Sequence, residues 1–164
     1  RHLEFLDTNI GEDLYFSLPA IELANHTEVI SYCGYNWFYN TASVSNTSHR
    51  SSEKLLFEET LDSILSMLSN RHISLTPMLE HYFVRLVAWY LLYTCKGDGI
   101  QLARANLEKC IMWLDIRLPM WRSDVYASPL RPRGDAAANR IAAWLFVKHP
   151  VLFAIAITCY SRIP

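Results

Sequence analysis

The sequence predicts an all-α fold, with five or six helices in an irregular bundle or a short helical-repeat-like array behind an irregular aromatic N-terminal segment. Three observations support this fold class. The 164 residues are 51% hydrophobic, which is enough for the core of one ordinary domain. Only 5 Gly and 7 Pro occur, too few for a chain made mostly of loops. Beyond about residue 52, apolar residues recur with the period of a helix.

The N-terminal third carries the weakest helical pattern. Ser17 and Pro19 are suited to begin one short helix, and Asn25 is suited to end it. Residues 29 to 39 are rich in β-branched and aromatic side chains, so any strand is expected there. Residues 41 to 52 include 7 Ser or Thr in 12 positions. We expect a flexible loop there, because so few apolar groups cannot order a segment.

A helix is expected over residues 53 to 69. Its apolar stripe consists of Phe57, Leu61, Ile64 and Leu68. Ser52 is the expected N-cap, and Glu53 would complement the helix dipole in the first turn. The stripe predicts that one face of this helix packs into the core.

The next helix is expected over residues 77 to 95. Thr76 is suited to cap it, with proline as the first helical residue. Its residues are apolar on all sides, which predicts a central, fully surrounded helix with Trp89 buried in it. Lys96 and Gly97 provide a basic last turn and a C-terminal glycine.

Three more helices are expected in the second half of the chain. Residues 99 to 118 form an amphipathic stripe that ends at a proline. Residues 120 to 134 contain two prolines and one glycine, and are expected to form a second flexible loop. Asp135 would then cap an alanine-rich helix over 136 to 147, and a proline would start the last helix over 151 to 160.

The net charge of -1 hides an uneven distribution. Residues 1 to 95 carry 5 basic and 11 acidic side chains, for -6, and residues 96 to 164 carry 10 basic and 5 acidic, for +5. The two halves could neutralise each other inside one fold. Alternatively, the basic half could face an acidic partner or nucleic acid, although its arginines are dispersed rather than clustered.

The sequence favours an intracellular location, in the cytoplasm or nucleus. Four cysteines lack disulfide-scaffold and zinc-site spacing, and are expected to be buried thiols: Cys33, Cys95, Cys110 and Cys159. Sequons at Asn25 and Asn46 point the other way, but such short patterns arise easily by chance. The first residues lack a signal-peptide pattern, and Lys148 interrupts the apolar stretch 141 to 160, so we expect no membrane span.

The chain begins with Arg1 and ends at Pro164, directly after an apolar segment. We therefore expect residues 1 to 164 to form a single helical domain that is a fragment of a longer chain.

No local motif predicts catalysis. Phosphate-binding glycine loops and the hydrolase nucleophile elbow are missing from the sequence. His72 and His81 lie too far apart for metal ligands on one helix turn, and the Arg-Gly-Asp letters at 133 to 135 suit a loop glycine followed by a cap. We expect no metal, no cofactor and no small-molecule substrate. A non-enzyme is favoured over an enzyme whose site is assembled from distant residues.

Residues 88 to 119 resemble one tetratricopeptide repeat unit. The resemblance rests on Ala88-Trp89-Tyr90-Leu91 opening a helix, Lys96-Gly97-Asp98 at a turn, Ala103 on a second helix, and Glu108-Lys109-Cys110-Ile111 with Leu114-Asp115 after it. The turn is one residue too long, the closing proline stands late, and no second copy follows, although stable arrays need about three repeats. The resemblance implies a protein-binding scaffold, and the alternative is an ordinary antiparallel helix pair with a glycine turn.

Two aromatic segments are candidate contact surfaces, because Trp, Tyr, Met and Arg are enriched at interfaces. The candidate partner-binding residues are Trp37, Phe38, Met120, Trp121, Arg122, Arg131 and Arg133. These rings could instead cover the ends of the helical core, or stack on single-stranded bases. We expect a non-catalytic protein–protein interaction module, a scaffold or complex subunit, that binds another protein or itself. A helical nucleic-acid-binding domain is the alternative, and an enzyme is third.

Overall fold

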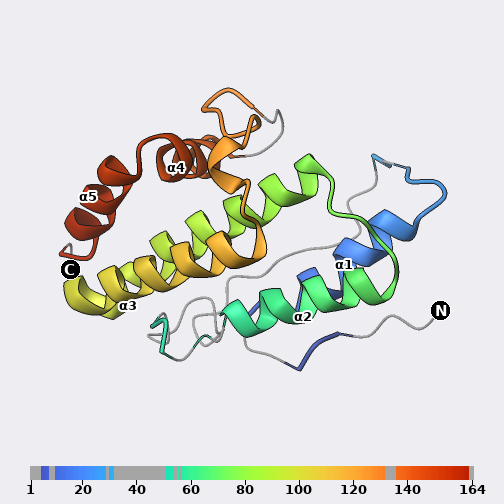
Figure 1. Cartoon of the computed structure of the whole chain (residues 1–164), viewed down its shortest axis with the longest axis horizontal. Coiled ribbons are helices and arrows are strands. Elements are labelled where there is room, and N and C mark those ends of the chain that lie inside the picture. The colour runs from blue at the N-terminus through green and yellow to red at the C-terminus, as the bar shows by residue number, and fades with distance from the viewer. Residues whose placement is uncertain are drawn as a thin grey trace.

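The all-α prediction is confirmed. The computed structural model describes residues 5–7, 10–28, 30–31, 51–53, 55, 57–131 and 136–162. Its elements are α1 (Glu12–Leu23), α2 (Phe57–Asn70), α3 (Pro77–Arg117), the short 3₁₀ helix η1 (Trp121–Ser123), α4 (Ala137–Lys148) and α5 (Pro150–Tyr160) (Figure 1). Within these residues the only β pairing is an isolated bridge between Ser128 and Arg131.

The long helix α3 is a hairpin of two arms that meet at Gly99. Gly99 has φ 66° and ψ -177°, a backbone conformation that glycine adopts without steric cost. Figure 1 shows the second arm, residues 100–117, running back alongside the first, residues 77–98. The prediction that the helix ends at Lys96 and Gly97 is therefore wrong, because Gly97 stays helical and the break falls two residues later.

The first helix begins earlier than predicted, at Glu12 rather than near Ser17. Gly11 precedes it with φ 78°, and a Cβ at Gly11 would stand 3.0 Å from the methyl group of Thr60 on α2. Two acidic residues in the first turn favour this start, since they complement the helix dipole. Pro19 consequently lies inside the helix instead of at its beginning.

The second helix begins later than predicted, at Phe57 rather than at Glu53. Ser52, the expected cap, donates its backbone N–H to Asp98 at 2.7 Å. Asp98 also accepts a hydrogen bond of 3.0 Å from the Ser51 hydroxyl. These bonds hold the segment before α2 against the turn of the α3 hairpin, and α2 begins too far along the chain for Ser52 to be its N-cap.

The remaining helix boundaries lie within two residues of the predicted ones. Thr76 caps α3, and its hydroxyl accepts from the N–H of Leu79 at 3.2 Å. The helices α4 and α5 lie within two residues of the ranges predicted for them. The N-cap position of α4 is Ala136. The expected cap Asp135 and the aromatic segment 32–40 lie outside the described residues, as does most of the loop predicted over 41–52.

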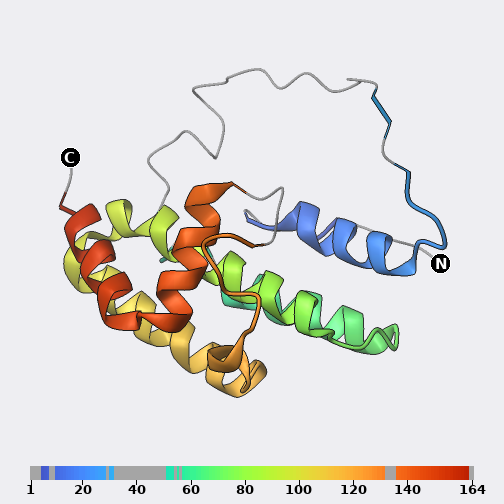
Figure 2. The same cartoon turned by 90° about the horizontal axis from the view of Figure 1, so that it is seen from above.

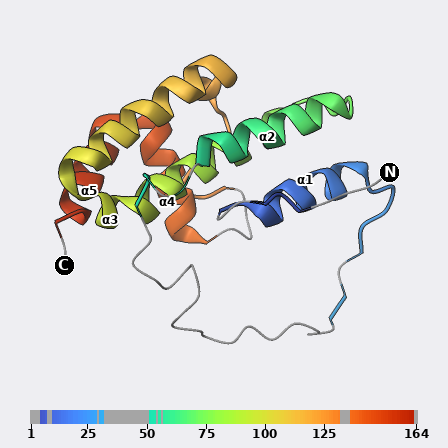
Figure 3. The ribbon, with the colours of Figure 1, turned by 90° about the horizontal axis from the view of Figure 1, so that it is seen from below.

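The core is organised around α3, which contacts α2, α4, α5 and η1. Figures 2 and 3 show α1 and α2 toward one end of the molecule and α5 at the other end. Between α2 and the first arm of α3, the rings of Phe57 and Tyr90 stack with centroids 4.3 Å apart, and the Tyr90 hydroxyl donates to the Leu55 carbonyl at 3.0 Å. Where η1, α4 and α5 meet, Phe146 packs between Trp121 and Phe153.

The first arm of α3 is not surrounded on all sides, so the prediction that Trp89 is buried is wrong. Trp89 is 36% exposed, whereas its neighbours Ala88 and Tyr90 are fully buried. Trp89 lines two open pockets, one beside α5 and one beside Gly11 and Phe57, so its ring is only partly covered by the described residues. An apolar helix surface therefore does not prove complete burial where the neighbouring helices leave open space.

Candidate functional site

The loop that follows α3 is one of the two predicted contact segments, and its tryptophan is part of the core. Trp121 is 2% exposed. Its ring stacks on Phe146 with centroids 5.0 Å apart, and its indole N–H donates to Asp115 at 2.8 Å. The expected alternative, that this ring covers the ends of neighbouring helices, describes its position in the structure.

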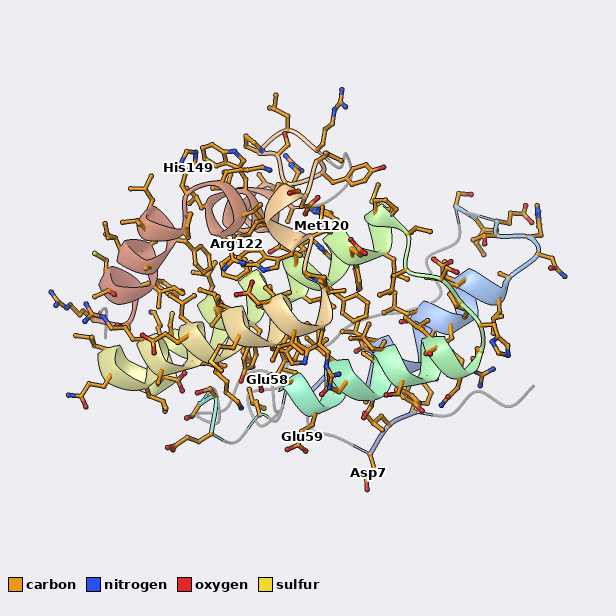
Figure 4. The ribbon with its side chains drawn as sticks, viewed as in Figure 1. Asp7, Glu58, Glu59, Met120, Arg122 and His149 are labelled. Atoms are coloured by element: carbon orange, nitrogen blue, oxygen red, sulfur yellow. The ribbon has the colours of Figure 1, made fainter. Side chains whose placement is uncertain are left out.

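Three other predicted residues of this loop, Met120, Arg122 and Arg131, are exposed. Met120 and Arg122 lie at η1, where Figure 4 labels them, and Arg131 lies farther along the same loop. Arg122 forms an ion pair with Asp115, and its guanidinium lies 4.4 Å from the centre of the Trp121 ring. Hydrogen bonds from Arg122 and then from the Trp121 indole lower the pKa of Asp115. The predicted contacts Trp37, Phe38 and Arg133 lie outside the described residues.

A second candidate, which the sequence did not reveal, is an open groove of about 570 Å³ between α3 and α5. Its lining residues are Trp89, Leu92, Tyr93 and Lys96 from the first arm of α3, and Ala156, Cys159 and Tyr160 from α5. We call this the α3–α5 groove. Apart from Lys96, the side chains of this set are uncharged.

Aromatic contacts shape both sides of the α3–α5 groove. Trp89 and Tyr93, one turn apart on α3, stack with ring centroids 5.0 Å apart. Across the groove, the Lys96 ammonium lies 4.8 Å from the centre of the Tyr160 ring, within range of a cation–π interaction. Lys96 thus places the one positive charge of the lining beside an aromatic ring.

The apolar surface continues from the groove onto the outer face of α5. Phe153 and Ile157 are buried against the rest of the fold, but Val151, Leu152 and Ile155 are 71%, 53% and 53% exposed. The sequence of α5, PVLFAIAITCY, contains no charged residue. Large apolar side chains close together on a surface are typical of interaction sites. We call this part the outer face of α5.

Local sequence sets the junction between α4 and α5. Ala142 and Ala143 near the middle of α4 are buried, as their small side chains permit. Pro150 then begins α5 directly after His149, whose ring lies edge-on to Trp144 with centroids 4.7 Å apart. Figure 4 labels His149 at this junction between α4 and α5.

The charged side chains of residues 136–162, which include α4 and α5, are all basic: Arg140, Lys148 and Arg162, with no Asp or Glu. A surface of this kind attracts a partner with carboxylates or other anionic groups.

Elsewhere, the acidic and basic halves of the chain neutralise each other. Lys109 of α3 pairs with Glu58 of α2 at 3.1 Å. Arg117 pairs with Asp62 at 2.9 Å, and Asp62 also accepts from the Trp113 indole at 2.9 Å. Figure 4 shows Glu58 on the side of α2 that faces α3. These contacts support the internal explanation of the uneven charge.

A buried histidine and aspartate form the most enzyme-like pair among the described residues. His81 Nδ1 lies 2.7 Å from Asp124 Oδ2, with the side chains 4% and 6% exposed. Asp124 also accepts from the backbone N–H of Tyr126 at 2.8 Å. The pair lacks a nucleophile, since His81 Nε2 has no hydrogen-bond partner among the described residues. Its contacts instead tie the loop after η1 to α3.

The cysteines divide into buried and exposed thiols. Cys95 and Cys110 are buried, and burial raises the pKa of the Cys95 thiol to about 11 and that of Cys110 well above its ordinary value. Cys159 is exposed, so the prediction of a buried thiol is wrong for this residue. The cause is the open groove, because Cys159 forms part of its lining. Cys33 lies outside the described residues.

The sequence signal for the groove was weak. Trp89 and Tyr93 have the spacing of core residues, and their exposure depends on the position of α5, which lies far away in the chain. The better signal was α5 itself, since a helix without any charge must either be surrounded or bind something.

Comparisons with models of protein families, with curated proteins and with solved structures give no match to this chain. Among the described residues, no helix combines the length and apolar character needed to cross a bilayer. Those residues also contain no group of three or more His, Cys, Asp or Glu side chains placed to hold a metal ion.

Proposed function

We propose that the chain is a non-catalytic interaction domain that binds another protein through the α3–α5 groove and the outer face of α5. The observation that carries this proposal is the groove itself, an open space of about 570 Å³ with an aromatic and aliphatic lining. Clefts between helices are common places for binding, and Trp and Tyr supply large contact areas at little cost in conformational entropy.

The outer face of α5 supports the same proposal. Val151, Leu152 and Ile155 lose favourable burial energy while they face water, at about 25 cal/mol for each Å² of apolar surface. A partner that covers this face would recover that energy. Because the groove and the outer face share α5, one partner can cover both.

We retain Met120, Arg122 and Arg131 as proposed secondary contacts, since all three are exposed on the loop after α3. We also propose an intracellular location within a larger assembly. Cys95 and Cys110 support it as buried free thiols, which are typical of reducing compartments.

The nucleic-acid alternative receives less support. Lys109, Arg117 and Arg122 each pair with a carboxylate of this same chain, which reduces their attraction for phosphate. A titration against single-stranded and duplex oligonucleotides at two salt concentrations separates the two proposals. Phosphate-driven binding weakens steeply with salt, whereas binding through an apolar groove changes little.

Site-specific photocrosslinking in cells that naturally express the chain tests the proposal directly. A diazirine analogue of lysine replaces Lys96, which lines the groove. The matched control carries the same analogue at Lys109, whose side chain is 65% exposed and pairs with Glu58. We expect a discrete protein adduct from position 96 and none of that size from position 109.

The same adduct should disappear when Trp89→Ala is added to the position 96 variant, because the change removes the largest aromatic surface of the groove. Adducts of the same size from both positions, or none from position 96, would contradict the proposal.

A further inference from the structure

We infer that the α3–α5 groove takes an amphipathic helix from another protein, and that this helix carries a carboxylate that pairs with Lys96. The inference rests on the proposed function and specifies the chemistry of the partner. Two features of the groove lead to it, namely its direction along α3 and its charge.

The groove follows one face of a helix. Its α3 residues are Trp89, Leu92, Tyr93 and Lys96, which have the i, i+3, i+4, i+7 spacing of a single helix face. Seven residues of helix extend for about 10 Å. A helical segment lying along this length would place its own residues at i, i+3 or i+4, and i+7 between α3 and α5, as in helix-in-groove recognition.

Along most of the groove, its lining favours apolar side chains on the bound helix. Trp89 and Tyr93 present stacked ring surfaces from one side, and Ala156 leaves room opposite them because its side chain is small. An occupant therefore needs large aliphatic or aromatic residues on the face that enters the groove.

Charge at the end of the groove selects an acidic residue. Lys96 is exposed and is the one charged side chain among the residues that line the groove. Its nearest acidic neighbour in sequence, Asp98, already accepts hydrogen bonds from Ser51 and Ser52. A carboxylate on the occupant would add an attractive interaction that a neutral residue cannot make.

The same charges disfavour an occupant that is α5 of a second copy of this chain. Pairing α5 with α5 would bring together two segments of residues 136–162, each with three basic side chains and no acidic one. Like charges at an interface cost affinity. A separate protein with an acidic, amphipathic helix satisfies both the apolar lining and Lys96.

The test is a selection of helical peptides displayed on phage, with the 164-residue chain as the target and with fluorescence anisotropy to measure Kd. We expect the selected peptides to share large apolar residues at helical spacing and at least one Asp or Glu. Trp89→Ala should weaken binding about thirtyfold, as for an aromatic hot spot. Lys96→Glu should weaken the acidic peptides about tenfold and, in a parallel selection, yield peptides with Lys or Arg instead.

Met112→Ala serves as the matched control, since Met112 is 63% exposed on the other arm of α3 and should leave Kd unchanged. Circular dichroism verifies the fold of each variant. Because Lys96 is exposed, Lys96→Glu remains informative even where Trp89→Ala lowers stability.

The outcomes separate this inference from the proposed function. Peptides that depend on Trp89 but lack acidic residues, or that bind Lys96→Glu unchanged, would overturn the inference and leave the proposed function standing. Peptides indifferent to Trp89→Ala would overturn both. Sedimentation with vesicles of equal parts phosphatidylcholine and phosphatidylserine, abolished by Ile155→Asp, would also overturn both by showing that α5 binds lipid.

Discussion

Charged side chains are distributed differently in two regions of the molecule, the α2–α3 interface and the helix pair α4–α5. Between α2 and α3, acidic side chains of one half of the chain meet basic side chains of the other, as in Glu58 with Lys109 and Asp62 with Arg117. In residues 136–162, by contrast, all charged side chains are basic, and α5 leaves an apolar face exposed.

The difference separates a region whose side chains are paired within the chain from a region that leaves apolar side chains exposed. Charges and apolar groups at the α2–α3 interface find their partners within the chain, so this region stabilises the fold. The helix pair α4–α5 is anchored by its buried side, while Val151, Leu152 and Ile155 of α5 face outward with large apolar side chains. We therefore expect variants at the first region to change stability, and variants on the exposed side of the second to change binding.

The largest expected effect comes from the buried side of the helix pair α4–α5. Phe146 is fully buried between Trp121 and Phe153. Phe146→Ala should lower the free energy of unfolding by about 3 to 5 kcal/mol, because it removes a large core side chain and leaves a cavity. Urea denaturation measures this change. Phe146→Leu should cost clearly less, and an equal cost for both would show that packing around the ring is unimportant.

The next effect tests the α2–α3 interface. Asp62→Ala should cost about 1 to 3 kcal/mol, because Trp113 is only 8% exposed and its indole N–H would lose its acceptor. Arg117→Ala should cost about 0.5 kcal/mol, since the Arg117 side chain is 49% exposed and water screens the ion pair. Urea denaturation midpoints measure the loss of stability in each variant. Equal losses in the two variants would mean that the hydrogen bond from the Trp113 indole to Asp62 contributes nothing to stability.

A smaller loss of stability is expected at the groove. Trp89→Ala should lower the free energy of unfolding by about 1 to 2 kcal/mol, because the side chain already faces water in part and the substitution removes its remaining contacts, which include stacking on Tyr93. Thermal unfolding of Trp89→Ala and Phe146→Ala under the same conditions measures the two losses of stability side by side. A loss as large as that of Phe146→Ala would show that Trp89 is a core residue after all.

The smallest expected effect is the dependence of stability on alkaline pH. Burial raises the pKa of Cys95 from 9.0 to about 11, and that of Cys110 rises in the same direction. As the pH rises, the thiols of the unfolded chain therefore ionise at a lower pH than those of the folded chain. The contribution of the buried thiols to the free energy of unfolding is fully present below pH 9 and is lost as the pH rises through about 11.

Urea midpoints between pH 8 and pH 11 measure this decline. Replacing both buried cysteines by alanine should make it shallower, while Cys159→Ala, a change at an exposed position, serves as the control. If stability falls equally with pH in the unchanged chain, the double cysteine variant and Cys159→Ala, the assignment to the buried thiols is contradicted.

Sequence reasoning predicted the features that depend on neighbouring residues. Thr76 followed by proline fixed the start of α3, and the proline at 150 separated α4 from α5. It failed where a distant residue decides the outcome. Ser52 binds Asp98 across the fold instead of capping α2, and the break in α3 falls at Gly99 although Gly97 offered the same freedom.

The candidate site could not be predicted for the same reason. Trp89 and Cys159 form one groove only because α5 packs beside the first arm of α3, and no local pattern links these two positions. Trp121 illustrates the converse, since its residue type suggested a contact surface while its ring fills the space beside Phe146. Residue type alone therefore did not distinguish an interface from a core.

The central claim, that the surface around the α3–α5 groove is covered by a partner, is tested most directly by the alkylation rate of Cys159. Cys159 is exposed and lines the groove, and Cys33→Ser removes the thiol whose position is not described. N-ethylmaleimide labelling is followed by mass spectrometry in the native assembly isolated from cells and in the purified chain. A cysteine introduced by Met112→Cys on the other arm of α3 serves as the control. We predict that Cys159 reacts much more slowly in the assembly while position 112 reacts equally in both, and equal rates at Cys159 would contradict the account.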